Sequence, residues 1–124
     1  MKIKKGYIQI VSPILINFLS FNDKKIAAMA FWPFIFYRHL GYKNFSVLEN
    51  HEKIHHKQQL ELLILPFHLL YLTHFIVGLI IFKNFKKAYF NVVFEKEAYQ
   101  NEQNLCYLQN RKSYQWLRYV FNVK

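Results

Sequence analysis

The chain has 124 residues, which is enough for one domain and too few for two. Hydrophobic residues make up 53% of it, so it can fill a core and is not a disordered tail. Its 17 Lys and Arg residues against 7 acidic residues give a formal charge of +10, which favours contact with anionic lipid or nucleic acid. A mean hydropathy of −0.02 argues against a polytopic transporter, and a single cysteine excludes a disulfide framework.

The first part of the chain, residues 1–45, is an apolar N-terminal segment. Two runs rich in Ile, Val, Leu and Phe, residues 7–21 and 26–37, flank a polar stretch at 22–24 that is typical of a turn. Each run carries a proline, which favours edge or irregular strands. We predict a short β-hairpin here, with two short interfacial helices as the alternative.

Helix signals begin at Ser46, which fits a capping box with Glu49. The first helix should run to about Leu65, because Pro66 must end or kink it. The chain is then almost continuously apolar to Phe82, and after a basic break a further helix is expected. The expected ranges are 47–65, 62–82 and 87–110 for these helical segments, and 111–124 for an aromatic, basic C-terminal end. We therefore predict a single domain that is mainly α, with α+β possible.

The motif that carries chemistry is His51-Glu52-Lys53-Ile54-His55, an HExxH sequence. Side chains four positions apart share one face of a helix, so the two imidazoles can bind one Zn²⁺. Glu52 lies about 100° round the helix, beside the metal, where it can accept a proton from a zinc-bound water. His56 points away from that face and is expected in solvent. The alternative interpretation is a polar helix face with scattered histidines.

A third ligand is needed, because catalytic zinc usually has three protein ligands and one open position. Glu95 and Glu97 lie on the expected downstream helix, and they point about 200° apart. Glu95 shares its face with Ala98, Tyr99 and Glu102, whereas the face of Glu97 is otherwise Gln and Asn and is typical of a solvated surface. We prefer Glu95 as the ligand and keep Glu97 as the alternative. Both carboxylates could instead be surface partners of neighbouring lysines.

The HExxH sequence followed by Glu95-Lys96-Glu97-Ala98 resembles the gluzincin metallopeptidases. It is most similar to the membrane prenyl-protein and heat-shock endopeptidases and to the short minigluzincins, in which Glu-x-x-Ala-Asp supplies the third ligand. The resemblance implies a zincin-like core over residues 46–110, with Zn²⁺ held by His51, His55 and Glu95 and with Glu52 as the catalytic base. Tyr99 stands where the family has the Asp that supports a metal-binding histidine, so the resemblance places a hydroxyl in that supporting role.

Residues 62–82 would extend about 31 Å as a helix, close to the hydrocarbon thickness of a membrane. Lys83, Lys86 and Lys87 follow at once, and a chain this short has little protein with which to cover the run. We therefore expect membrane association, with a core helix as the alternative. A straight helix through this run would carry Glu95 too far from His55, so a closed metal site requires the chain to reverse near Pro66.

These observations together predict a small zinc metallopeptidase, associated with the inner, cytoplasmic membrane, that hydrolyses peptide bonds of a peptide or protein with a zinc-activated water. The alternative is a noncatalytic membrane-associated subunit that retains the HExxH metal site. Membrane lipid is an expected partner, and a protein partner is compatible with either interpretation. Nucleic acid is not expected as a partner, because the lysines are scattered and the sequence contains no recognised binding fold.

Overall fold

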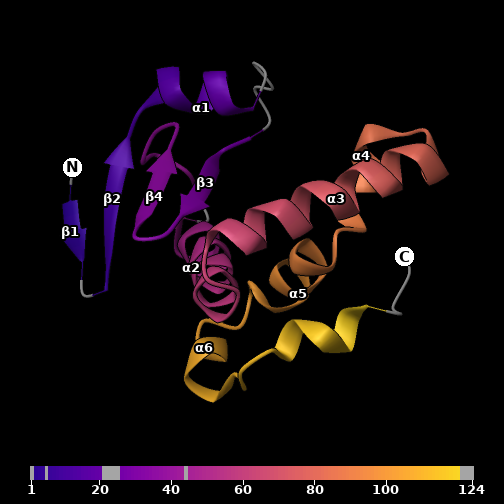
Figure 1. Cartoon of the computed structure of the whole chain (residues 1–124). Helices are drawn as coiled ribbons and strands as arrows, with labels where there is room; N and C mark the ends of the chain where they lie inside the picture. The colour runs from indigo at the N-terminus through magenta and orange to yellow at the C-terminus, as the bar shows by residue number, and fades with distance from the viewer. Residues whose placement is uncertain (1, 5, 21–25, 44, 121–124) are drawn as a thin grey trace.

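A computed structural model describes residues 2–4, 6–20, 26–43 and 45–120. A small sheet and one short helix lie at one end of the molecule, and the remaining helices lie at the other (Figure 1). Helices dominate, so the prediction of a mainly α chain with a short β segment is confirmed.

The sheet has four strands, which run in the order β1-β2-β4-β3. Their bounds are Lys2–Lys4 for β1, Tyr7–Val11 for β2, Ala28–Phe31 for β3 and Phe34–Tyr37 for β4. The pairs β1–β2 and β3–β4 are antiparallel hairpins, whereas β2 and β4 run parallel. The hairpin expected between the two apolar runs does not form, because β2 of the first run and β4 of the second run parallel, and each instead belongs to a hairpin of its own. The turn predicted at 22–24 lies outside the described residues.

The second half of the first apolar run is helix α1 (Pro13–Leu19), not strand. The Ser12 side chain accepts a hydrogen bond from the backbone N–H of Leu15, as an N-cap residue does. Pro13 lies in the first turn, where its missing N–H costs nothing because that group would have no partner inside the helix. This proline opens a helix and does not mark an edge strand.

Helix α2 (Phe45–Glu61) carries the HExxH sequence and packs against the sheet. The helix already includes Phe45, and the Glu49 carboxylate accepts hydrogen bonds from Tyr7 and Gln9 of β2. The predicted capping box, in which Glu49 would reach back toward Ser46, is therefore wrong. Glu49 instead fastens the start of α2 to the sheet.

The chain reverses between α2 and α3 (Leu65–Phe82), as closure of a metal site requires. The reversal is made by Leu63 and Ile64, whose φ angles are both positive, at 62° and 58°, a backbone conformation that residues other than glycine rarely adopt. Pro66 follows in the first turn of α3, so it begins the second helix and does not end the first. Because of this reversal, α3 runs back beside the site instead of continuing away from it.

The single helix expected over 87–110 is broken into shorter pieces. These are α4 (Phe85–Phe90), α5 (Val93–Asn101) and α6 (Tyr107–Asn110), and a 3₁₀ helix, η1 (Gln115–Tyr119), follows them. Helix α4 packs closely on α3 at Gly78. A Cβ added to this glycine would lie only 3.1 Å from the Cα of Ala88. Phe67, Val92, Val93 and Phe94 form a core beneath this region, and Trp116 and Tyr119 of η1 pack against it.

Candidate metal site

Helix α2 lies between the sheet on one side and α5 on the other, so most of its circumference is covered (Figure 1). Of its eight buried residues only Ile54 is apolar. Burying polar side chains is costly unless each finds hydrogen-bond partners, so the contacts of these residues define what α2 does. The buried polar residues are Asn50, His51, Glu52, His55, His56, Gln58 and Gln59.

Three side-chain atoms converge on one point between α2 and α5. Glu95 Oε1 lies 3.1 Å from His51 Nε2 and 3.1 Å from His55 Nε2, and the two nitrogens are 3.2 Å apart. Ligand atoms held at about 2.0–2.1 Å in tetrahedral geometry stand about 3.3 Å from one another. The three atoms are therefore spaced as the ligands of a single Zn²⁺-sized ion would be, and the structure brings together the three residues that the sequence selected.

The second ring nitrogen of His51 is held by a residue for which the sequence predicted no such contact. Nδ1 of His51 lies 2.8 Å from Glu102 Oε2. An ionised carboxylate only accepts hydrogen bonds, so Nδ1 carries a hydrogen, and Nε2 is the nitrogen directed at the shared point, where it can bind a metal once its own proton is released. Glu102 is seven positions beyond Glu95 and therefore on the same helical face, which is a signal that the sequence already contained.

Tyr99 does not take the supporting role expected of it. Its hydroxyl lies 2.9 Å from the hydroxyl of Tyr89, and its ring packs edge-on against the His51 ring with centroids 4.5 Å apart. Tyr99 therefore contacts His51 through its ring, while the carboxylate that orients the imidazole comes from Glu102, one helical turn later. The side-chain support that was expected for a metal-binding histidine therefore exists, but Glu102 supplies it and Tyr99 does not.

The second ring nitrogen of His55 is held by Gln58, whose Oε1 lies 2.8 Å from Nδ1. The Gln58 Nε2 donates to the backbone carbonyl of Phe94 and to Glu97 Oε1, both of which are acceptors. These two bonds fix the amide so that its oxygen faces His55, which places a hydrogen on Nδ1 and directs Nε2 at the same shared point.

Glu97 is fully buried and does not lie on a solvated surface, so that expectation is wrong. Its carboxylate pairs with Arg111, whose Nε lies 2.6 Å from Oε2, and accepts further hydrogen bonds from Gln58 and Tyr107. Arg111 also pairs with Glu61 at the end of α2. The chain after α5 folds back and covers this face, so Glu97 ties the C-terminal segment to α2, and the alternative assignment of Glu97 as a ligand is wrong.

The other oxygen of Glu95 accepts a hydrogen bond of 2.6 Å from the hydroxyl of Tyr71 on α3. The two oxygens of this carboxylate therefore have different partners, because Oε1 faces the two histidines while Oε2 faces Tyr71. Tyr71 lies inside the apolar run, where nothing in the sequence pattern indicates a polar function. Its contact shows that α3 packs onto the site with one face.

The charges at the site favour a bound cation. Burial alone would lower the pKa of His51, but its hydrogen bonds to Glu102 and Glu95 raise it to about 10. Burial likewise opposes protonation of His55, and the charge of Glu95 outweighs it and raises that pKa. Burial alone would raise the pKa of Glu95, but the two histidines hold it well below its usual range. The site thus attracts protons, and a metal ion would displace them.

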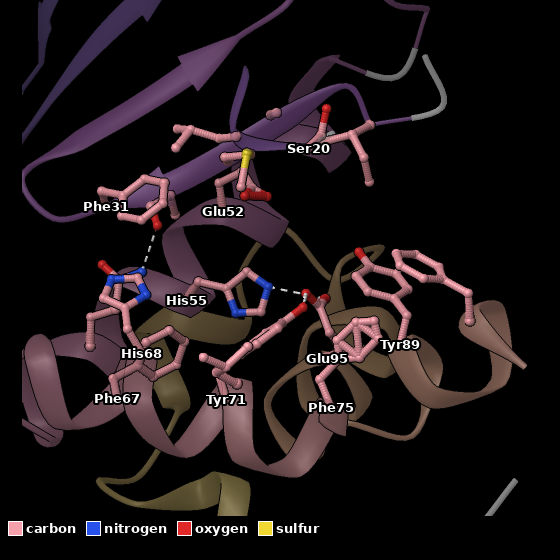
Figure 2. Close-up of a pocket in the computed structure, with 18 residues that line it drawn as sticks. Ser20, Phe31, Glu52, His55, Phe67, His68, Tyr71, Phe75, Tyr89 and Glu95 are labelled. Atoms are coloured by element: carbon pink, nitrogen blue, oxygen red, sulfur yellow. Dashed lines mark hydrogen bonds and ion pairs between the residues drawn. The ribbon is translucent and has the colours of Figure 1, made fainter. Parts of the chain in front are cut away.

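Glu52 lies beside the three converging atoms and not among them. Its carboxylate is within 4.8 Å of the ligand nitrogens of His51 and His55, and it lines the same cavity as His55 and Glu95. In Figure 2 the Glu52 side chain approaches the cavity from the opposite side to Glu95. Burial raises the pKa of Glu52. This placement matches the base position that the HExxH sequence predicts.

His56 was expected in solvent, and that prediction is wrong. It is buried, and its Nε2 lies 2.9 Å from the backbone oxygen of Phe34 on β4. Burial lowers its pKa to about 4, so this histidine is neutral near pH 7 and donates to the carbonyl. The face of α2 that points away from the converging atoms is covered by the sheet.

Comparison of the chain with protein-family models, with curated proteins and with solved structures finds no match. Support for a function comes from the residues of the chain and their geometry.

Proposed function

We propose that this chain is a small membrane-associated zinc metallopeptidase. One observation carries the proposal: His51 Nε2, His55 Nε2 and Glu95 Oε1 lie 3.1–3.2 Å apart. Two imidazoles and one carboxylate are a donor set found in catalytic zinc sites, where a fourth position stays open to water or substrate. The cavity beside His55 and Glu95 is where that open position would face.

Each residue of the site has a distinct part in the proposed reaction. His51, His55 and Glu95 would hold Zn²⁺, and Glu102 and Gln58 would orient the two imidazoles. The bound ion would polarise the peptide carbonyl and acidify a water. Glu52 would take the proton from that water and pass it to the departing amine, and its burial favours a carboxylate that can carry the proton between the two steps.

The direct test combines metal analysis with hydrolysis of a peptide mixture. We expect about one zinc per chain in gently purified protein, and we expect Glu52→Gln to keep the metal while abolishing hydrolysis, because an amide cannot accept the proton. His51→Ala should lose the metal. His56→Ala is the control, since His56 bonds the sheet and should leave zinc content unchanged. Absence of any transition metal, together with no effect of added zinc on thermal stability, would overturn the proposal.

The same experiment separates the catalytic proposal from its alternative. A protein that binds zinc but hydrolyses no peptide, with or without Glu52, would be the noncatalytic subunit that retains a metal site. If Glu52→Gln loses zinc instead, the result would identify Glu52 as a metal ligand.

Membrane association is supported by helix α3. It has a mean hydropathy of 1.9 over 18 residues, and only Phe67 and Gly78 of the helix are buried. Its inner face reaches the site through Phe67 and Tyr71, so its exposed apolar face is the part available to lipid. Lys83, Lys86 and Lys87 directly follow it, where they would meet anionic lipid headgroups.

This arrangement leads us to propose docking to the cytoplasmic face of the inner membrane. Flotation with vesicles tests it: we expect the protein to float with vesicles containing anionic lipid, more strongly than with zwitterionic vesicles. Protein that stays at the bottom of the gradient with both kinds of vesicle would contradict membrane association.

A further inference from the structure

A cavity of about 320 Å³ opens beside the candidate metal site. Glu52, His55 and Glu95 form part of its wall, and aromatic and aliphatic side chains form most of the rest (Figure 2). The volume is about twice the ~150 Å³ that suffices for benzene in a protein interior, so it can hold a large side chain with adjoining backbone. The main apolar lining residues are Met29, Phe31, Phe67, Leu72, Phe75 and Phe85.

One wall of this cavity is β3, which is an edge strand of the sheet. Backbone groups in an antiparallel pair point alternately toward the partner strand and away from it. The N–H of Arg38 donates to the carbonyl of Ala27, so Ala27 faces β4, whereas Ala28 and Ala30 direct their backbone groups outward. Such an outward edge would ordinarily accept an extended peptide as an additional strand.

Gln59 of α2 already occupies part of that edge. Its Nε2 donates to the carbonyl of Ala30 at 2.7 Å, and its Oε1 accepts from the backbone N–H of Trp32 at 2.6 Å. The side chain is buried, so no peptide can reach these groups without displacing it. What is left of the outward edge, around Ala28, is too short to bind a peptide through backbone pairing.

We propose that the cavity selects its peptide by one large apolar side chain, aromatic or leucine-like, placed next to the bond to be cut. The proposal rests on the peptidase function proposed above. The lining supplies apolar contact over most of the wall, and the carboxylates of Glu52 and Glu95 disfavour an acidic side chain at the same place. Backbone pairing of the peptide with β3 contributes little to the selection, because Gln59 occupies the outward groups of Ala30 and Trp32.

The test uses zinc-loaded protein and blocked peptides that are identical except at one position, which is Phe, Leu, Ala or Lys. We expect kcat/KM for the Phe and Leu peptides to exceed that for the Ala peptide by about 100-fold, since the apolar pocket acts on transition-state binding. Values within about threefold of one another for all four peptides, or a preference for Lys, would overturn the proposal.

A pair of matched variants on α3 locates the effect. Leu72 lines the cavity and is 55% exposed, while Leu69 is 57% exposed and is not part of the lining. Leu72→Trp narrows the cavity, so we expect it to lower kcat/KM about tenfold more for the Phe peptide than for the Ala peptide. Leu69→Trp should change neither value. An equal effect of both variants would contradict the assignment of the cavity.

Failure of the peptidase function would be distinguishable from failure of this inference. If no peptide is cleaved, binding of the Phe and Ala peptides to the metal-free protein is measured by calorimetry. Binding of the Phe peptide at least about tenfold tighter, weakened by Leu72→Trp and not by Leu69→Trp, would support the cavity assignment without catalysis. Equal binding of the two peptides, or no binding of either, would overturn it.

Discussion

Helices α2 and α3 reverse the usual relation between polarity and burial. Seven of the eight buried residues of α2 are polar, whereas α3 is apolar along most of its length and buries only Phe67 and Gly78. The two helices are consecutive in the chain and meet at the reversal of Leu63 and Ile64. What differs between them is which other elements cover them. The polar helix α2 is enclosed by the sheet and α5, whereas the apolar helix α3 has one face that the described residues leave exposed.

The difference teaches that hydropathy alone does not place an element inside or outside a small protein. The buried polar groups of α2 are matched by acceptors and donors from the sheet and from α5, and hydrogen-bonded polar groups are tolerated in an interior. Within the described residues, the rest of the chain leaves the outer face of α3 uncovered. Polar side chains on the inner helix are what the proposed metal site requires, and the apolar outer surface is what the proposed membrane docking requires.

The largest expected effect is at Glu95, the proposed metal ligand on α5. Glu95→Ala should lower zinc affinity by more than about 100-fold, because it removes a proposed ligand and not only a residue that orients one. Competition with a chromogenic chelator measures the affinity. Affinity within about threefold of the parent protein would show that the three converging atoms are not the zinc site.

Glu97 provides the contrast within the same helix. Glu97→Ala should destabilise the protein by about 3 kcal/mol, because it leaves the buried Arg111 without one of its two partners. Urea unfolding of the metal-free protein measures this change. Glu95→Ala should cost less stability in the same experiment, since the two histidines that it leaves behind can release their protons, whereas Arg111 stays charged. The reverse order would contradict the assignment of Glu97 to folding and Glu95 to metal.

Glu102 should have an intermediate effect. Glu102→Gln keeps the size of the side chain but removes the charge that orients His51, so we expect zinc affinity to fall about tenfold. Gln103→Ala, at an exposed neighbouring position, is the control and should leave the affinity unchanged. Equal affinities for parent and Glu102→Gln would mean that the imidazole needs no carboxylate behind it.

The raised pKa of His51 predicts how the stability of metal-free protein depends on pH. The folded protein holds this proton up to about pH 10, while the unfolded chain releases it near pH 6.5. The contribution is therefore complete below about pH 6.5 and is lost as the pH rises through 10, at no more than about 1.4 kcal/mol per pH unit. Thermal unfolding between pH 6 and 10 should show this decline, and zinc-loaded protein should show less of it because the metal replaces the proton.

The smallest effect on stability is expected at the outer face of α3. Ile80→Glu replaces an exposed apolar side chain, so it should change the free energy of unfolding by no more than about 0.5 kcal/mol. It should nevertheless weaken binding to anionic vesicles about tenfold, because it removes an isoleucine side chain that the proposed docking would bury in the lipid surface. Gln109→Glu, with the same charge change at another exposed position, is the control. Vesicle binding that falls equally in both variants would assign the effect to net charge.

The sequence by itself determined the features that depend on neighbours within a turn or two of helix. The spacing of His51 and His55 placed both imidazoles on one face, and the spacing of Glu95 from Ala98 and Tyr99 favoured it over Glu97. The same spacing also pointed to Glu102, but the family pattern drew attention to Tyr99 instead. Local periodicity was sufficient here because side chains three, four and seven positions apart lie on one face of a helix whatever the rest of the chain does.

The tertiary structure alone decided which surfaces are covered. It buried Glu97 against Arg111, it buried His56 against β4, and it brought Tyr71 to Glu95. It also made the reversal at Leu63 and Ile64. Leucine and isoleucine both disfavour a positive φ, and neither residue is of a type that favours a turn. The three contacts join residues that are 14 to 24 positions apart, and the reversal overrides the local preference of its residues. Burial depends on which distant segment folds over a residue. A short-range sequence pattern does not encode that.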